Sequence, residues 1–140
     1  MKWEFEDGTT FNIADYPDAF GFIYRIEYDN GQIYLGKKDM FTKVVLPKNR
    51  NRKKKEVFYR ESLSWKQYEG STKLSKGLTV KRKVVLYVAN TRRALTYLET
   101  KVLFKYDAIF NEKCLNKNIG GLYFDNVFEP LKEPIKKEYR

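Results

Sequence analysis

The sequence predicts an α+β domain in which a small three-stranded antiparallel sheet is flanked by helices and carries an inserted basic loop. Two runs rich in β-branched and aromatic residues surround residues 29–31, as expected for a β-hairpin, and a third run spans residues 80–89. Apolar residues then recur at intervals of three and four between residues 95 and 106. Strands that precede a helix, rather than alternate with helices, indicate an α+β fold with an antiparallel sheet.

The chain divides into an arm, a domain and a tail. Residues 1–19 are expected to form an N-terminal arm laid over the domain, because EDGTT is polar and DYPDAF resembles a turn. The domain should span residues 20–124, a length that can bury its own core. Residues 125–140 contain proline and many charges, which predicts an extended C-terminal tail.

A basic insertion is expected within the domain at about residues 41–60. Its segment VVLPKNRNRKKK holds a proline, and six of the eight residues 48–55 are basic, which is typical of an exposed loop. The following VFYRESLSWKQY predicts a short helix that ends at residues 69–71.

The strongest helix pattern begins after residue 90 and runs to about Phe110. Either Asn90 or Thr91 can cap its N-terminus. The apolar stripe comprises Leu95, Leu98, Val102 and Tyr106. Glu99 lies on or beside this stripe, where a carboxylate needs a partner, either a metal ion or a basic side chain such as Arg92 or Lys101.

Charge and rare residue types limit the chemistry. The 28 Lys and Arg residues outnumber the 18 Asp and Glu residues, and the formal charge of +10 makes nucleic acid the first partner to consider, with a merely soluble basic surface as the alternative. The single cysteine, Cys114, excludes an internal disulfide, and the absence of histidine excludes imidazole zinc sites and a histidine base. Any metal must have oxygen ligands, which indicates Mg²⁺ or Mn²⁺.

Membrane insertion and export are not expected. No apolar run has the length that spans a bilayer, and the residues after Met1 lack the apolar region of a signal peptide. We therefore expect a cytoplasmic protein with no membrane partner.

The geometry of the hairpin loop decides whether two tyrosines lie together. A two-residue loop at residues 30–31 would place Tyr24 and Tyr34 on opposite faces of the hairpin. A three-residue loop at residues 29–31, with Gly31 in the left-handed region, would pair Ile26 with Tyr34 and place both tyrosines on one face. Asp29 and Asn30 suit the turn of the second arrangement.

The hairpin also carries a paired motif. Phe22-Ile23-Tyr24 is followed ten residues later by Tyr34-Leu35-Gly36, which resembles the motif of the GIY-YIG nuclease family, with Phe for the first Gly and Leu for the second Ile. Glu99 stands where that family has its metal-binding glutamate, and Asn116, in the predicted loop LNKNIGG, where it has a late asparagine. The segment ESLSWKQYEGSTKL resembles a stretch in a phage-encoded branch of these endonucleases. The resemblance covers roughly residues 20–121.

This resemblance implies a metal-dependent DNA endonuclease, encoded by a phage and acting in the host cytoplasm. It implies that Glu99 holds a single divalent cation, Mg²⁺ or Mn²⁺, while a water molecule attacks phosphorus. We expect Tyr24 to act as the base and Tyr34 as its partner, with Asn116 completing the site. A phenol can serve as a base only where nearby cations stabilise its ionised form.

One departure from the family concerns an arginine. The family carries it on a helix about eight residues after its second motif, and the residue here is Val44. Lys37, Lys38 or Arg60 could supply the cation that binds the scissile phosphate, although lysine lacks the bidentate geometry of arginine.

The basic insertion is the expected contact to the DNA backbone, because clustered cations release counterions from a duplex; a solvated loop is the alternative. The predicted contact residues are Lys48, Arg50, Arg52, Lys53, Lys54 and Lys55. Trp65 and Tyr68 could stack on a splayed base, although aromatic residues at this spacing also occur in cores.

Three readings compete at this point. The first is the endonuclease on duplex DNA, and the second is a nucleic-acid-binding protein on the same scaffold with reduced or lost activity, which the missing arginine favours. A PD-(D/E)xK site formed by residues 17–18 and 99–101 is disfavoured, because Glu99 falls in a helical pattern and that site needs a strand. A domain of this size can use a second copy to select its target, so a homodimer is also considered.

Overall fold

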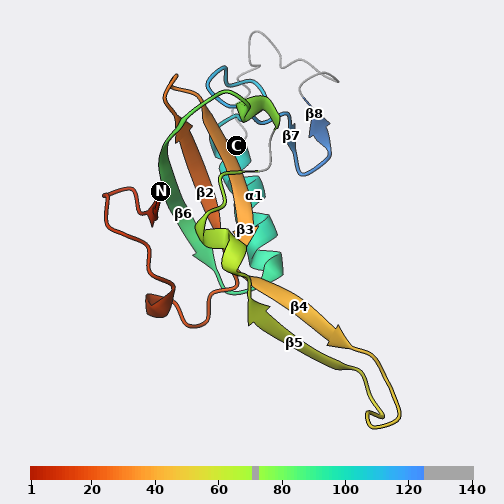
Figure 1. Ribbon diagram of the computed structural model, residues 1–140. Helices are drawn as coiled ribbons and strands as arrows, with labels where there is room; N and C mark the ends of the chain where they lie inside the picture. The colour runs from red at the N-terminus through yellow and green to blue at the C-terminus, as the bar shows by residue number, and fades with distance from the viewer. Residues whose placement is uncertain (71–72, 125–140) are drawn as a thin grey trace, which may run out of the picture.

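The computed structural model describes residues 1–70 and 73–124 and contains a four-stranded sheet with one α-helix against it (Figure 1). The strand order is β1 (Trp3–Glu4), β6 (Val80–Ala89), β2 (Gly21–Tyr28) and β3 (Ile33–Asp39). Strands β6, β2 and β3 are antiparallel, whereas β1 runs parallel to β6. The α+β class is therefore confirmed, but the expected number of three strands is wrong because residues of the N-terminal arm add a fourth.

The α-helix α1 (Arg92–Lys105) covers one face of the sheet. Thr91 caps it, since its side-chain oxygen accepts a hydrogen bond from the backbone N–H of Ala94 at 3.1 Å. Leu95 and Val102 pack with Ile23 of β2. The helix ends before the expected Phe110, because the chain then enters turns in which Asp107 has a φ of +50°. In the part of the chain described, the other helices are short 3-10 turns, so the sheet has an α-helix on one face only.

A second hydrophobic cluster lies on the opposite face of the sheet. It joins buried residues of the N-terminal segment, the central strand and the chain after the basic insertion, among them Trp3, Phe11, Phe22, Tyr24 and Trp65. The N-terminal segment also includes the 3-10 helix η1 (Ile13–Asp15). Residues 1–19 thus contribute to the sheet and to the core, and the division of the chain at residue 20 stays a prediction.

The hairpin of β2 and β3 has the three-residue loop. Gly31 has a φ of +88°, and its N–H donates a hydrogen bond to the carbonyl of Tyr28 at 3.1 Å. Ile26 pairs with Tyr34, and Tyr24 pairs with Gly36. This register brings Tyr24 and Tyr34 onto the same face, with ring centroids 6.2 Å apart.

The basic insertion is a β-ribbon and not a loop. Strands β4 (Phe41–Leu46) and β5 (Glu56–Glu61) pair antiparallel and project away from the four-stranded sheet (Figure 1). The prediction of a loop is wrong because the dense charge of residues 48–55 belongs only to the tip, while β-branched and aromatic residues form both arms. The helix expected in VFYRESLSWKQY is reduced to η2 (Leu63–Lys66), a 3-10 turn that follows β5.

The last described residues form a small hairpin beside α1. Strands β7 (Asn118–Ile119) and β8 (Tyr123–Phe124) pair antiparallel, so the loop expected at residues 115–121 contains a short strand.

A further 3-10 turn, η3 (Lys73–Ser75), precedes β6. The expected tail at residues 125–140 lies outside the described residues. Within the described ranges, no helix combines the length and the apolar character required to cross a membrane.

Candidate active site

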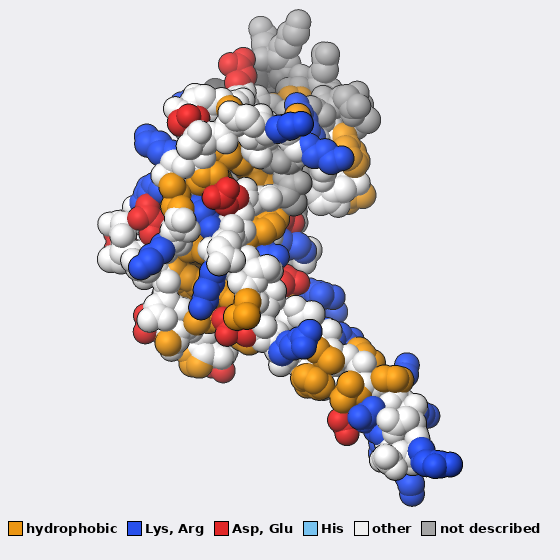
Figure 2. Space-filling model, in the orientation of Figure 1, with side chains coloured by type: hydrophobic (Ala, Val, Ile, Leu, Met, Phe, Trp, Pro, Cys, Tyr) orange, Lys and Arg blue, Asp and Glu red, His pale blue; other side chains and the backbone are white. Residues whose placement is uncertain are grey.

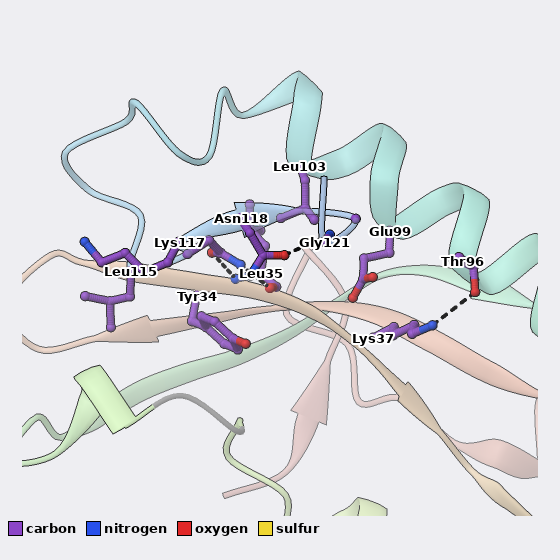
Figure 3. A pocket seen from close by; sticks show the side chains of 12 residues that line it. Tyr34, Leu35, Lys37, Thr96, Glu99, Leu103, Leu115, Lys117, Asn118 and Gly121 are labelled. Carbon is purple, nitrogen blue, oxygen red and sulfur yellow. Dashed lines mark hydrogen bonds between the residues drawn. The ribbon is translucent and has the colours of Figure 1, made fainter. Parts of the chain in front are cut away.

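A pocket of about 430 Å³ opens along the outer edge of β3 (Figure 3). One wall comes from α1, and another comes from the segment that leads into β7. The polar side chains that line it include Tyr34, Lys37, Thr96, Glu99, Asn116 and Asn118. Four of the residues expected at the catalytic site therefore meet here, namely Tyr34, Lys37, Glu99 and Asn116.

Glu99 projects from α1 toward β3 (Figure 3). Burial raises the pKa of its carboxyl group, while the charge and the backbone N–H of Lys37 lower it. The Lys37 ammonium donates a hydrogen bond to Thr96 Oγ1 at 3.0 Å, and Arg92 approaches Asp39 at 3.8 Å. Among residues 1–70 and 73–124, no basic side chain forms an ion pair with Glu99. The alternative of a salt-bridged glutamate is thus not realised there.

The donor set is compatible with one hard divalent cation. The described residues contain no group of three or more Asp, Glu, Cys or His side chains that could enclose a metal. Glu99 offers a partly buried carboxylate at an open pocket, and Mg²⁺ is commonly held by one or two carboxylates, with water and substrate phosphate as its other ligands. Glu99 would accordingly be the protein's own anionic ligand.

The side-chain amide of Asn116 hydrogen-bonds to the backbone at the outer edge of β3, as a neighbouring strand would. Its Oδ1 accepts a hydrogen bond from the N–H of Leu35 at 3.0 Å, and its Nδ2 donates to the carbonyl of Leu35 at 2.7 Å. Next to it, the N–H of Leu115 donates to the carbonyl of Ile33 at 2.8 Å. The buried amide thus satisfies the open edge of the sheet and fixes one wall of the pocket.

Tyr24 reaches the same edge from the opposite face of the sheet. Its side chain is only 1% exposed and lies across Gly36, where an added Cβ would stand 2.4 Å from the Tyr24 hydroxyl oxygen. Burial raises the pKa of Tyr24 well above its usual range, and a hydrogen bond with Tyr68 and the negative charge of Glu99 raise it further. The Tyr24 hydroxyl therefore lies against the backbone of β3, the strand whose outer edge borders the pocket.

Tyr68 connects Tyr24 to a cation. The rings of Tyr24 and Tyr68 are 5.8 Å apart, and Lys38 Nζ lies 4.4 Å from the centre of the Tyr68 ring. Tyr68 follows η2, so its role beside Tyr24 depends on a fold that brings a segment 44 residues away back to the hairpin. In the sequence, Tyr68 is notable only as part of the Trp-x-x-Tyr stretch, and that stretch suggested stacking on a base rather than a contact with Tyr24.

Trp65, Arg60 and Val44 lie outside the pocket at the edge of β3. Trp65 is 4% exposed and packs in the core, where its Nε1 donates to Glu61 at 3.1 Å. This burial favours the alternative of a core residue over stacking on a base. Arg60 is exposed on β5 and is not among the residues lining the pocket. Val44 lies on β4, so the helix that would carry the family's arginine is replaced by a strand.

Replacing Gly36 by alanine should displace the Tyr24 hydroxyl from its position against β3. The new Cβ would meet both the hydroxyl oxygen and Cζ of Tyr24, at 2.4 and 2.6 Å, so the phenol must move. If the pocket belongs to the endonuclease that the sequence predicts, cleavage should be at least about tenfold slower while duplex binding is retained. Gly8→Ala is a control for backbone strain alone, because Gly8 has a φ of +88° but nothing within 4 Å of an added Cβ. Equal rates for the two variants would contradict this role of Gly36.

Comparison with known families identifies the family of the chain. Residues 3–123 match a family model described as "Putative endonuclease segE, GIY-YIG domain". No curated protein and no solved structure matches the chain significantly. The matched range contains Tyr24, Tyr34, Glu99 and Asn116, together with the N-terminal strand β1. The chain thus belongs to the segE GIY-YIG endonuclease domain family.

Proposed function

We propose that the protein is a metal-dependent endonuclease that hydrolyses phosphodiester bonds of duplex DNA. Membership of a nuclease family already implies a nucleic-acid substrate. The observation that carries the finer proposal is that Glu99, Lys37 and Tyr34 line one pocket at the edge of β3, while the Tyr24 hydroxyl lies against Gly36 of the same strand. A base, a carboxylate ligand and a cation at one edge are the groups that water attack on phosphorus requires.

The chain's own groups have distinct roles in this proposal. Glu99 would hold a Mg²⁺ or Mn²⁺ ion, which when bound supplies positive charge to the phosphate and the leaving oxygen. Tyr24, once ionised, accepts the proton of the attacking water, and Tyr34 orients that water. Lys37 binds the scissile phosphate from the pocket, in place of the arginine that the family carries. Lys38 acts through Tyr68, whose hydroxyl hydrogen-bonds with that of Tyr24.

The cleavage rate should rise with pH. Because burial raises the pKa of Tyr24 above its ordinary value, the active phenolate is a minor species at neutral pH, and its population increases as pH increases. We expect about a tenfold increase in single-turnover rate per pH unit between about pH 7 and 9. A rate that falls or stays constant over this range, on a duplex that remains bound, would contradict a tyrosine base.

The proposal is tested by incubating the protein with supercoiled plasmid at low salt, with Mg²⁺, with Mn²⁺ and with a chelator. Nicked or linear product should form only in the two metal reactions. Supercoiled DNA in every reaction, combined with a mobility shift, would instead support a nucleic-acid-binding protein on the same scaffold. The specific observation that favours this second function is Val44, since no arginine lies where the family has one.

A homodimer is the proposed route to cutting both strands, because one pocket can attack one phosphodiester at a time. Sedimentation of the protein with and without a duplex would measure the number of copies bound. A 1:1 complex that linearises plasmid in a single binding event would contradict this arrangement.

A further inference from the structure

The β4–β5 ribbon concentrates most of the chain's excess charge. Residues 41–61 contain eight basic and two acidic side chains, a surplus of six out of the formal +10 of the whole chain. Figure 2 shows these basic side chains grouped toward the free end of the ribbon, away from the four-stranded sheet. Such an arm attracts a polyanion.

The two faces of the ribbon differ in character. Directly paired residues share a face, so Lys43, Val45, Val57 and Tyr59 form one face, here called the valine face. Val45, Val57 and Tyr59 are 46%, 51% and 56% exposed. The other face carries Glu56 near the tip, where it approaches Arg52 at 3.7 Å, and its Val44 and Leu46 are only partly exposed. Each face carries one glutamate, because Glu61 pairs with Phe41 on the valine face, so the two faces differ in exposure and not in acidity. The valine face is the more exposed of the two.

The ribbon has a shape that suits one groove of DNA. Six residues per strand give an arm of roughly 20 Å, and two paired strands present a body that the major groove, about 12 Å wide, admits, whereas the minor groove, about 6 Å wide, does not. An isolated two-stranded ribbon with exposed apolar side chains is marginally stable in water, so a partner that covers it would stabilise it. The major groove also displays the thymine methyl group, an apolar contact for valine.

We propose that the β4–β5 ribbon inserts into the major groove of a DNA duplex, with the valine face against the base edges and the basic tip on the phosphates. The proposal rests on the proposed function for its duplex substrate. It adds a recognition element outside the pocket, because Val45 and Val57 do not line the catalytic edge of β3. It also assigns some sequence preference to thymine-containing steps.

The groove is identified by competition, measured by fluorescence anisotropy on a short labelled duplex in chelator. Because chelator prevents metal-dependent cleavage, a failure here is distinct from a failure of the nuclease proposal. Methyl green, which occupies the major groove, should displace the protein at concentrations at least about tenfold lower than netropsin, which occupies the minor groove. Displacement by netropsin with no effect of methyl green would overturn the proposal.

The face is identified by exchanging thymine for deoxyuracil, which removes only the major-groove methyl groups. The unaltered protein should bind the thymine duplex several-fold more tightly, as expected for lost methyl contacts. Val45→Ser combined with Val57→Ser should abolish this difference, whereas Val44→Ser combined with Phe58→Ser, on the opposite face, should retain it. Equal binding of both duplexes by the unaltered protein would overturn the assignment, and that comparison involves no substitution that could affect folding.

The tip is tested separately through salt dependence. Lys53→Gln, Lys54→Gln and Lys55→Gln together should reduce the slope of log K against log salt concentration by about 2 to 3, because each phosphate contact contributes about 0.9. An unchanged slope would show that the tip does not meet phosphate. The other candidate to cover the valine face is a second copy of the chain, which sedimentation of the free protein tests. A dimer that dissociates when Val45→Ser and Val57→Ser are combined would mean that a second copy covers this face.

Discussion

Glu99→Gln should abolish metal-dependent cleavage while leaving duplex affinity nearly unchanged. The substitution keeps the size of the side chain but removes the carboxylate that we assign as the protein's anionic ligand, so a loss of at least about 10³-fold is expected. Binding of Mn²⁺, followed by electron paramagnetic resonance, should weaken in parallel. Cleavage at the rate of the unaltered protein would remove Glu99 from the metal site.

The same variant should be more stable than the unaltered protein when metal is absent. Burial raises the pKa of Glu99, so the ionised carboxylate destabilises the metal-free fold at pH values above that raised pKa, and the penalty disappears below the pKa of the unfolded chain. We expect the midpoint of thermal unfolding to rise by about 2–5 °C at pH 7 and to change little near pH 4. A lower midpoint at pH 7 would mean that Glu99 stabilises the fold by another contact.

Tyr24→Phe should have the second largest effect, a loss of about 10²- to 10⁴-fold in single-turnover rate. The ring remains and can still pack across Gly36, so only the hydroxyl group is lost. The residual rate should also lose the increase with pH that is expected of the unaltered protein. These two effects together distinguish a base from a residue that merely supports the pocket.

Two further variants test the roles assigned to Tyr34 and Tyr68. Tyr34→Phe should cost less than Tyr24→Phe, because Tyr34 is assigned to orienting the water, and the reverse order would exchange the two roles. Tyr68→Phe should retain the packing against Lys38 but remove the hydrogen bond with Tyr24. We expect it to shift the pH profile without abolishing cleavage.

The sequence predicted the hairpin and left two loop lengths open, of which local chemistry supports the three-residue loop that the structure has. Asp29, Asn30 and Gly31 suit a three-residue turn, and that turn alone puts Tyr24 and Tyr34 on one face. Thr91 was one of two candidate caps, and the structure selects it. The position of Glu99 beside an apolar stripe left two partners open, a metal ion or a basic side chain, and only the resemblance to the nuclease family assigned it to the metal.

Contacts between distant segments could not be predicted in this way. The pairing of β1 with β6 joins segments about 80 residues apart in the sequence. Strand β1 consists only of Trp3 and Glu4, which is too short for the alternation of apolar and polar residues to reveal a strand. Tyr68 reaches Tyr24 only through the fold. The role of Asn116 as an edge of β3 likewise depends on tertiary placement of a loop residue.

The ribbon was missed for a different reason. Its tip is so basic that the charge run outweighed the strand pattern on each side, although Val44, Val45, Val57 and Phe58 all favour β-structure. Trp65 was assigned to DNA because an aromatic residue in a basic chain suits stacking, whereas its burial follows from packing with Phe11 and Phe22. In both cases composition was given more weight than local pattern.

The central claim is that one edge of β3 unites Tyr24 and Glu99 in a metal-dependent site. The most direct measurement is the anomalous scattering of manganese in crystals of the Tyr24→Phe variant bound to an uncleaved duplex. The account predicts one Mn²⁺ peak at about 2.1 Å from a Glu99 carboxylate oxygen, with a phosphate of the duplex in the pocket beside Lys37 and the ring of residue 24 facing it. A manganese peak away from Glu99, or a duplex bound with no phosphate near this edge, would contradict it.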